Sequence, residues 1–138
     1  MSAATKQRQL VEKFQIITDA HERLAAIVAS GGKWAALHQA ERLEEHRVRG
    51  CASHVWIQGS REAGQCRYRL AADSPLVLGL AALLCELYDR ASPGEVIAFE
   101  PSIFEELALD RQLSPTRLHG LASVRRALVQ IAQGAAAP

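Results

Sequence analysis

The sequence predicts a single α+β domain in which helices pack against a small antiparallel sheet of three strands. Three observations carry this prediction. Apolar residues recur at helical spacing near both ends of the chain, two short runs in the middle alternate apolar and polar residues, and three Ser-Pro pairs mark helix starts. A length of 138 residues with 49% hydrophobic content suits one ordinary core, so we expect one domain over residues 1–138.

The first expected element is one amphipathic helix over residues 7–30. Its apolar residues recur at three- and four-residue steps, and the pair Gly31-Gly32 is typical of a helix end. The next stretch, residues 33–46, is mixed in character. We expect a short polar helix within it, at residues 40–45.

The sheet is expected from the middle of the chain. Two runs alternate apolar and polar residues around a Gly-bounded polar loop at residues 59–64, which predicts an antiparallel hairpin. The apolar members are Val55 and Ile57 in the first run and Cys66, Tyr68 and Leu70 in the second. Residues 47–49 would add a short third strand.

The remainder is expected to be helical. In each Ser-Pro pair the serine can cap a helix whose first turn holds the proline, and Ser92 with Glu95 also fits a capping box. The segment from Pro75 to about Tyr88 is apolar nearly all round, as expected of a buried central helix. A short helix follows at residues 103–107, a last helix begins at Pro115, and residues 134–138 should fray.

Charge and composition argue against several classes of function. The 16 Lys and Arg nearly balance the 15 Asp and Glu, so the formal net charge of +1 gives no global reason to bind nucleic acid or an anionic membrane. The longest apolar run, residues 76–85, is shorter than the roughly 20 residues of a membrane span. The start lacks an apolar signal region and three cysteines cannot all pair, so we expect a reducing cytoplasm.

The residue that points most directly to chemistry is Cys51. It follows Arg47, Arg49 and Gly50 and precedes a strand pattern, so it should lie in a tight loop whose cationic neighbours favour the nucleophilic thiolate. The alternative is a small buried hydrophobe, and local context leaves the two open. The other two cysteines, Cys66 and Cys85, fit packed positions in the sheet and the central helix better.

Two other kinds of site have weaker support. Cys51 and His54 have Cys-x-x-His spacing, but no second ligand pair appears, so we expect no metal. A small Cys-His thiol enzyme would need a base, and none of the candidates sits in a recognisable signature. These candidates are His21, His38, His46, His54 and His119. The chain contains neither a phosphate-binding P-loop motif nor a dinucleotide-binding glycine motif.

Three strings in order resemble the SufE family over most of the chain. The first is residues 47–51 with Ser53, Val55 and Trp56, which is similar to the family's cysteine loop. The second, Asp73 with residues 76–84, resembles the start of its central helix. The third, residues 113–117 with Gly120 and Leu121, resembles its closing helix.

This resemblance implies a fold, a function and partners. The fold would be α+β and similar to that of IscU-like iron–sulfur scaffold proteins. The chain would accept sulfur from a pyridoxal-phosphate-dependent cysteine desulfurase, of SufS or CsdA type, and activate that enzyme. It would then pass the sulfur to a SufBCD-like assembly scaffold, as a monomer or weak homodimer. Pyridoxal phosphate would belong to the partner, and the chain itself would bind no cofactor.

The resemblance also implies roles for individual residues. Cys51 would take persulfide sulfur by transpersulfuration, a relative of thiol–disulfide exchange. The supporting residues of the loop and its charge would be Arg49, Gly50, Ser53, His54 and Arg117. Asp73 and Arg47 would face the partner. An alternative from a different class is a regulatory module that activates a desulfurase without carrying sulfur itself.

Overall fold

The structure is a computed structural model that describes residues 1–135. It confirms the α+β class. The two strands, β1 (Val55–Glu62) and β2 (Gln65–Ala72), form an antiparallel hairpin. The longer helices are α1 (Ala3–Gln15), α2 (Ala20–Gly31), α3 (Pro75–Tyr88) and α6 (Pro115–Ala135), and the shorter ones are α4 (Pro93–Ala98) and α5 (Ile103–Glu106).

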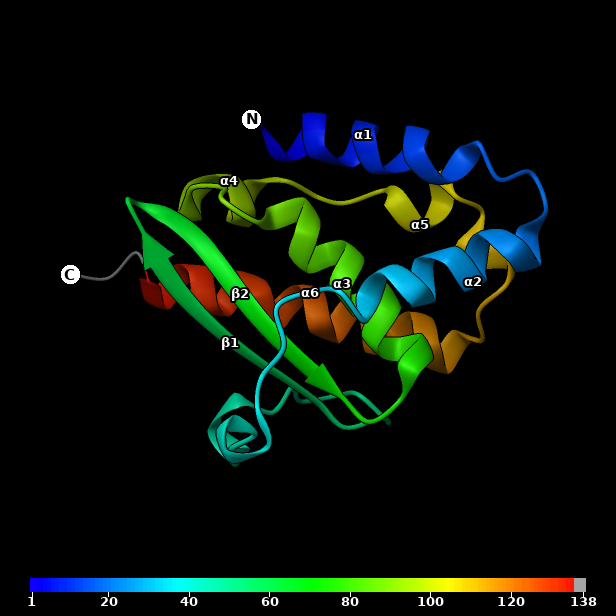
Figure 1. Ribbon diagram of the computed structural model, residues 1–138. Helices are drawn as coiled ribbons and strands as arrows, with labels where there is room; N and C mark the ends of the chain where they lie inside the picture. The colour runs from blue at the N-terminus through cyan, green and yellow to red at the C-terminus, as the bar shows by residue number, and fades with distance from the viewer. Residues whose placement is uncertain (136–138) are drawn as a thin grey trace.

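The helix α3 is the centre of the packing. Its Ser74 hydroxyl accepts a hydrogen bond from the Val77 amide, and Pro75 opens the helix as the Ser-Pro signal predicted. Four elements, β2, α6, α1 and α2, all contact α3. Figure 1 shows the hairpin crossing in front of α6, with α1 along the top of the view. Most of α3 is buried, so the predicted central helix is confirmed.

The N-terminal segment consists of two helices, so the single helix expected over residues 7–30 is wrong. The chain turns after α1, where Ile16 is 81% exposed, and Asp19 caps α2 by accepting a hydrogen bond from the Glu22 amide at 2.9 Å. Arg23 holds this turn by donating to the carbonyls of Ile17 and Thr18. Apolar residues keep their helical spacing across this turn, so the sequence pattern gives no sign that the helix is interrupted.

The described residues form a sheet of two strands, so the expected third strand at residues 47–49 is wrong. Arg47 makes one isolated bridge to Trp56, and the Val48 amide donates to the Val55 carbonyl at 2.8 Å. A 3-10 turn, η2 (Glu44–His46), ends just before this segment, and Gly50 at a φ of +84° turns the backbone just after it. Too few extended residues remain between these two turns for a strand.

The hairpin turn is tighter than the six-residue loop expected. Ala63 and Gly64 both have positive φ, as a two-residue turn between right-twisted strands requires, and the strands therefore extend through Gly59. Gly59 suits this position because an added Cβ would collide with Ile131 on α6. The hairpin packs directly against α6 there.

The shorter predicted elements meet different outcomes. The polar helix expected at residues 40–45 is two single 3-10 turns, η1 (Gln39–Glu41) and η2. Ser92 caps α4 through the Glu95 amide, but the Glu95 carboxylate accepts from the Ala3 amide at 2.7 Å and thereby ties α1 to α4. A third 3-10 turn, η3 (Leu109–Arg111), leads to α6. Helix α6 continues to Ala135, and the rest of the frayed end expected at residues 134–138 lies outside the described residues.

Candidate functional site

The loop that carries Cys51 is held at both ends. On its N-terminal side the Val48–Val55 hydrogen bond joins it to β1. On its C-terminal side the His54 amide donates to Asp73 Oδ1 at 3.2 Å, and the Asp73 amide donates to the His54 carbonyl at 3.1 Å. Cys51 is therefore presented on a short bend between two fixed points.

Gly50 is required in the middle of this bend. Its φ of +84° lies in the region that favours glycine, and an added Cβ would stand 2.8 Å from Ser123 Oγ on α6. The same Ser123 hydroxyl lies 3.2 Å from the Gly50 carbonyl, to which it can donate. The loop is thereby fixed to α6 immediately before Cys51.

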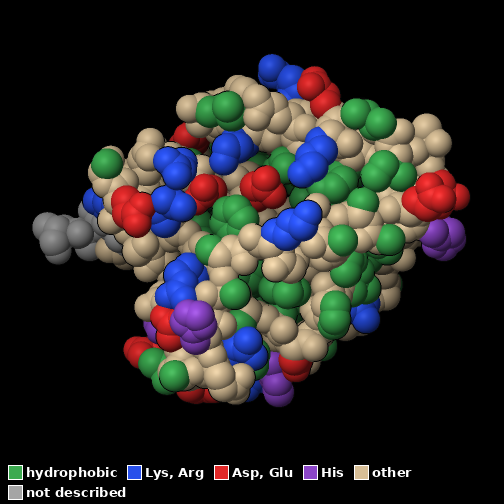
Figure 2. All heavy atoms as spheres, in the orientation of Figure 1, with side chains coloured by type: hydrophobic (Ala, Val, Ile, Leu, Met, Phe, Trp, Pro, Cys, Tyr) green, Lys and Arg blue, Asp and Glu red, His purple; other side chains and the backbone are tan. Residues whose placement is uncertain are grey.

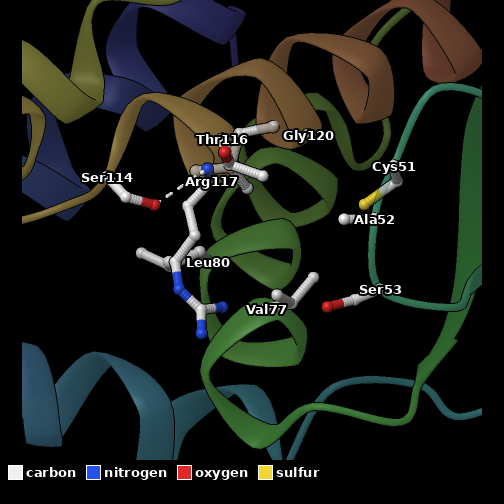
Figure 3. Close-up of a pocket in the computed structure, with 10 residues that line it drawn as sticks. Cys51, Ala52, Ser53, Val77, Leu80, Ser114, Thr116, Arg117 and Gly120 are labelled. Atoms are coloured by element: carbon white, nitrogen blue, oxygen red, sulfur yellow. Dashed lines mark hydrogen bonds between the residues drawn. The ribbon is translucent and has the colours of Figure 1, made fainter.

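Cys51 lines a pocket of about 190 Å³ between its own loop, α3 and α6 (Figure 3). Its lining combines small or apolar residues with four polar ones. The other lining residues are Ala52, Ser53, Val77, Leu80, Ser114, Thr116, Arg117, Gly120 and Leu121. A small side chain from another molecule can approach the sulfur through this pocket.

The sulfur of Cys51 rests against α6 at Gly120. A Cβ added to Gly120 would lie 3.1 Å from Cys51 Sγ, so the absence of a side chain there makes room for the thiol. Cys51 itself is half-buried. The thiol is sheltered by the helix on one side and open to the pocket on the other.

The remaining two cysteines are in a different environment. Cys66 is 2% exposed and Cys85 is fully buried in the core. Burial raises the pKa of both thiols above the ordinary value, because a thiolate loses its hydration there. Both remain protonated thiols, unsuited to nucleophilic chemistry.

The arginines that sequence reasoning placed beside Cys51 point elsewhere. Arg47 and Arg49 approach Glu44, with N–O distances of 3.8 and 3.5 Å, and neither lines the Cys51 pocket. Arg117 does line it, but its guanidinium extends along α3 rather than toward the sulfur (Figure 3). The Arg117 amide donates to Ser114 Oγ, which caps α6.

His54 and Asp73 form a contact of their own beside the loop. His54 Nδ1 lies 3.2 Å from Asp73 Oδ2, in addition to the hydrogen bonds that the two backbone amides donate, and both side chains are half exposed. The His54 ring also packs against Trp56, with ring centroids 5.8 Å apart. Ser53, the residue before His54, lines the Cys51 pocket. The structure thus brings Asp73, from the segment between β2 and α3, to the loop that carries Gly50, Cys51, Ser53 and His54.

Further properties of the described residues bear on function. No histidine lines the pocket or bonds to Cys51 within residues 1–135, and no group of three His, Cys, Asp or Glu residues there could hold a metal ion. None of the described helices has the length and apolarity to cross a bilayer. Charges of both signs are interspersed over the face shown in Figure 2.

Sequence reasoning assigned no role to Gly120 or Ser123. Gly120 occurs in the third resemblance string, and a glycine inside a helix signals a close approach by another group. Ser123 has one signal only: it is a polar residue between Leu121 and Val124 on a buried stripe, where its hydroxyl needs a partner.

Three comparisons relate the chain to known proteins. Residues 8–132 match the family model described as SufE, an Fe-S metabolism associated domain. An uncharacterized SufE-like protein of Synechocystis sp. is 30% identical over 116 residues, which cover 84% of this chain and 73% of that protein. The solution structure of a hypothetical protein from Thermus thermophilus is similar in fold, with a TM-score of 0.77 and 24% identity over 94% of this chain and 95% of that one.

Proposed function

The chain belongs to the SufE family, which is associated with Fe-S metabolism, and from this premise we propose that it carries sulfur on Cys51. The donor is a pyridoxal-phosphate-dependent cysteine desulfurase, and the receiver is a scaffold on which iron–sulfur clusters are assembled. The exchange takes place in the cytoplasm. The chain contributes a thiol and a docking surface, and the pyridoxal phosphate stays with the desulfurase.

The transfer is a displacement at sulfur. The Cys51 thiolate attacks the terminal sulfur of a cysteine persulfide on the desulfurase, and a new S–S bond forms on Cys51 as the S–S bond of the donor breaks. The donor cysteine leaves as a thiolate. One sulfur atom moves with no net oxidation or reduction, and Cys51 is left as a persulfide. The same displacement by a thiolate of the scaffold then releases the sulfur.

One observation supports this proposal above the others: Cys51 is the thiol that opens on a pocket, while the other two cysteines are buried. The half-sheltered position suits a carrier, because a persulfide in bulk water reacts with oxidants and free thiols. The hydrogen bonds between His54 and Asp73 and the turn at Gly50 hold the loop near this position.

The test is to locate the transferred atom. We expect the wild-type chain, mixed with a cysteine desulfurase and L-cysteine, to gain one sulfur atom on Cys51 by peptide mass spectrometry. Cys51→Ser should gain none, whereas Cys66→Ser should gain the same as wild type. Sulfur found on Cys66 or Cys85 in the Cys51→Ser protein would contradict the proposal.

A second measurement separates a carrier from a regulator that carries nothing. The rate at which the desulfurase consumes cysteine is measured with each variant added. A carrier must remove sulfur from the enzyme to stimulate it, so Cys51→Ser should bind without stimulating. Full stimulation by Cys51→Ser would instead indicate a regulatory binding module.

A further inference from the structure

Three arginines line one cleft beside the Cys51 loop, which shares no lining residue with the Cys51 pocket. Arg47 and Arg49 come from the segment that leads to Cys51, and Arg126 comes from α6. The cleft has a volume of about 170 Å³, and its other polar lining residues are Ser123 and Gln130. We call it the arginine cleft. Its charge contrasts with a whole chain whose formal net charge is +1.

The arginine cleft has more guanidinium groups than carboxylates to pair with them. Glu44 is the one carboxylate within 4 Å of any of the three among residues 1–135, and its distances of 3.8 Å to Arg47 and 3.5 Å to Arg49 are long for a charge-assisted hydrogen bond. Glu44 is also largely exposed, so water screens these contacts. Arg126 donates to Ser123 Oγ at 2.8 Å and meets no carboxylate in that part of the chain.

The place of the cleft in the loop determines what can reach it. Arg49 lies two residues before Cys51, a span of at most about 7 Å of backbone. Ser123 contacts both Arg126 and the Gly50 carbonyl, so the α6 side of the cleft adjoins the residue before the reactive cysteine. A protein whose sulfur reaches Cys51 Sγ therefore has its own surface near this loop and within reach of the arginine cleft that adjoins it.

The chemistry of the arginine cleft selects the side chains on that surface. Guanidinium groups bind carboxylates in a planar, often bidentate arrangement. We propose that the arginine cleft receives an Asp or Glu side chain from the protein that donates sulfur to Cys51. This inference rests on the proposed function and adds the chemistry of recognition. The donor presents acidic side chains beside its persulfide cysteine, and their carboxylates bind to Arg126, Arg49 and Arg47.

Charge reversal tests the assignment in the complete complex. Binding of the chain to a cysteine desulfurase is measured by biolayer interferometry at several NaCl concentrations. We expect Arg126→Glu and Arg49→Glu each to bind about tenfold more weakly at low salt, because a like charge replaces an attractive one. Their binding should also depend less on salt than that of wild type, since each has lost an attraction that salt screens.

Two matched variants separate electrostatics from damage to the fold. Arg8→Glu makes the same change in net charge on an exposed position of α1, on the opposite side of the molecule from residues 44–49 (Figure 1), and should bind as wild type does. Glu44→Gln removes the carboxylate that competes for Arg47 and Arg49. It should bind about twofold to fivefold more tightly, an improvement that a damaged fold would not give.

The outcomes distinguish this inference from the function beneath it. If wild type acquires sulfur on Cys51 but Arg126→Glu, Arg49→Glu and Arg8→Glu all bind equally well, the acidic-partner assignment is overturned and the sulfur-carrier function stands. If Glu44→Gln binds more weakly than wild type, the assignment is likewise overturned. If wild type neither binds the desulfurase nor acquires sulfur, the sulfur-carrier function and the acidic-partner assignment are both refuted.

Discussion

Replacing Gly120 by alanine tests the contact between α6 and the reactive thiol. An alanine within a helix is favoured over glycine by about 1 kcal/mol. Opposing this, the new Cβ would lie 3.1 Å from Cys51 Sγ, well inside the roughly 3.5–4.0 Å of an unstrained contact. The sulfur must therefore move by about 0.5 Å, which as an off-rotamer side chain costs about 0.5–1.5 kcal/mol. We expect the two effects nearly to cancel in the wild-type background.

A double-mutant cycle with Cys51→Ala isolates the contact. Once the sulfur is absent, Gly120→Ala should stabilise the protein by about 1 kcal/mol, the full helix-propensity gain. The difference between the two backgrounds, measured by urea unfolding, should be about 0.5–1.5 kcal/mol. Iodoacetamide should also alkylate Cys51 faster in Gly120→Ala, because the thiol is displaced toward the open side of its pocket. Equal stabilisation in both backgrounds, with an unchanged alkylation rate, would refute the reasoning.

Three further predictions follow from other contacts. Gly79→Ala should destabilise the protein by about 1–3 kcal/mol, because the new Cβ would stand 2.6 Å from the Val28 Cα and the backbone of a packed helix has little room to move. An unchanged midpoint of urea unfolding would contradict this. Burial raises the pKa of Cys85 and of Tyr68, so the unfolded chain loses these protons first. The free energy of unfolding should therefore fall by up to about 1.4 kcal/mol per pH unit for each group, above about pH 8.5 for Cys85 and above about pH 10 for Tyr68. Urea unfolding between about pH 8 and 11 measures this, and a constant value would count against it. The pKa of the Glu41 carboxyl is lowered to about 2 by its hydrogen bonds from Arg69, so an NMR titration should find it ionised at pH 3 in wild type and returning toward its usual range in Arg69→Gln.

The sequence predicted best those elements whose signals are local. Helix α3 has the predicted bounds because its cap, its proline and its continuous apolar character all lie within the segment itself. The turn between α1 and α2 was missed, since helical periodicity records which face is apolar but not where the chain reverses. Asp19 was the available local signal, as a residue type that favours caps.

In the candidate site, too, the features that depend on neighbouring residues were predictable and the others were not. The loop position of Cys51 and the turn at Gly50 could be predicted because both depend on neighbouring residues. The direction of the arginines could not, because Arg49 and Arg47 are attracted to Glu44 rather than to the thiol that is nearer in sequence. Gly120 and Ser123 lie some 70 positions away in the chain, and packing of α6 alone brings them to the loop.

Because Cys66 and Cys85 are buried, a folded molecule can form only one disulfide bond when it is oxidised. With one thiol within reach of solvent, oxidation can join a folded copy to one other molecule and no more. The products are a covalent pair or a mixed disulfide with a small thiol, so oxidative stress cannot cross-link the native protein into chains or lock it into an internal ring. Restoring it takes the reduction of a single bond.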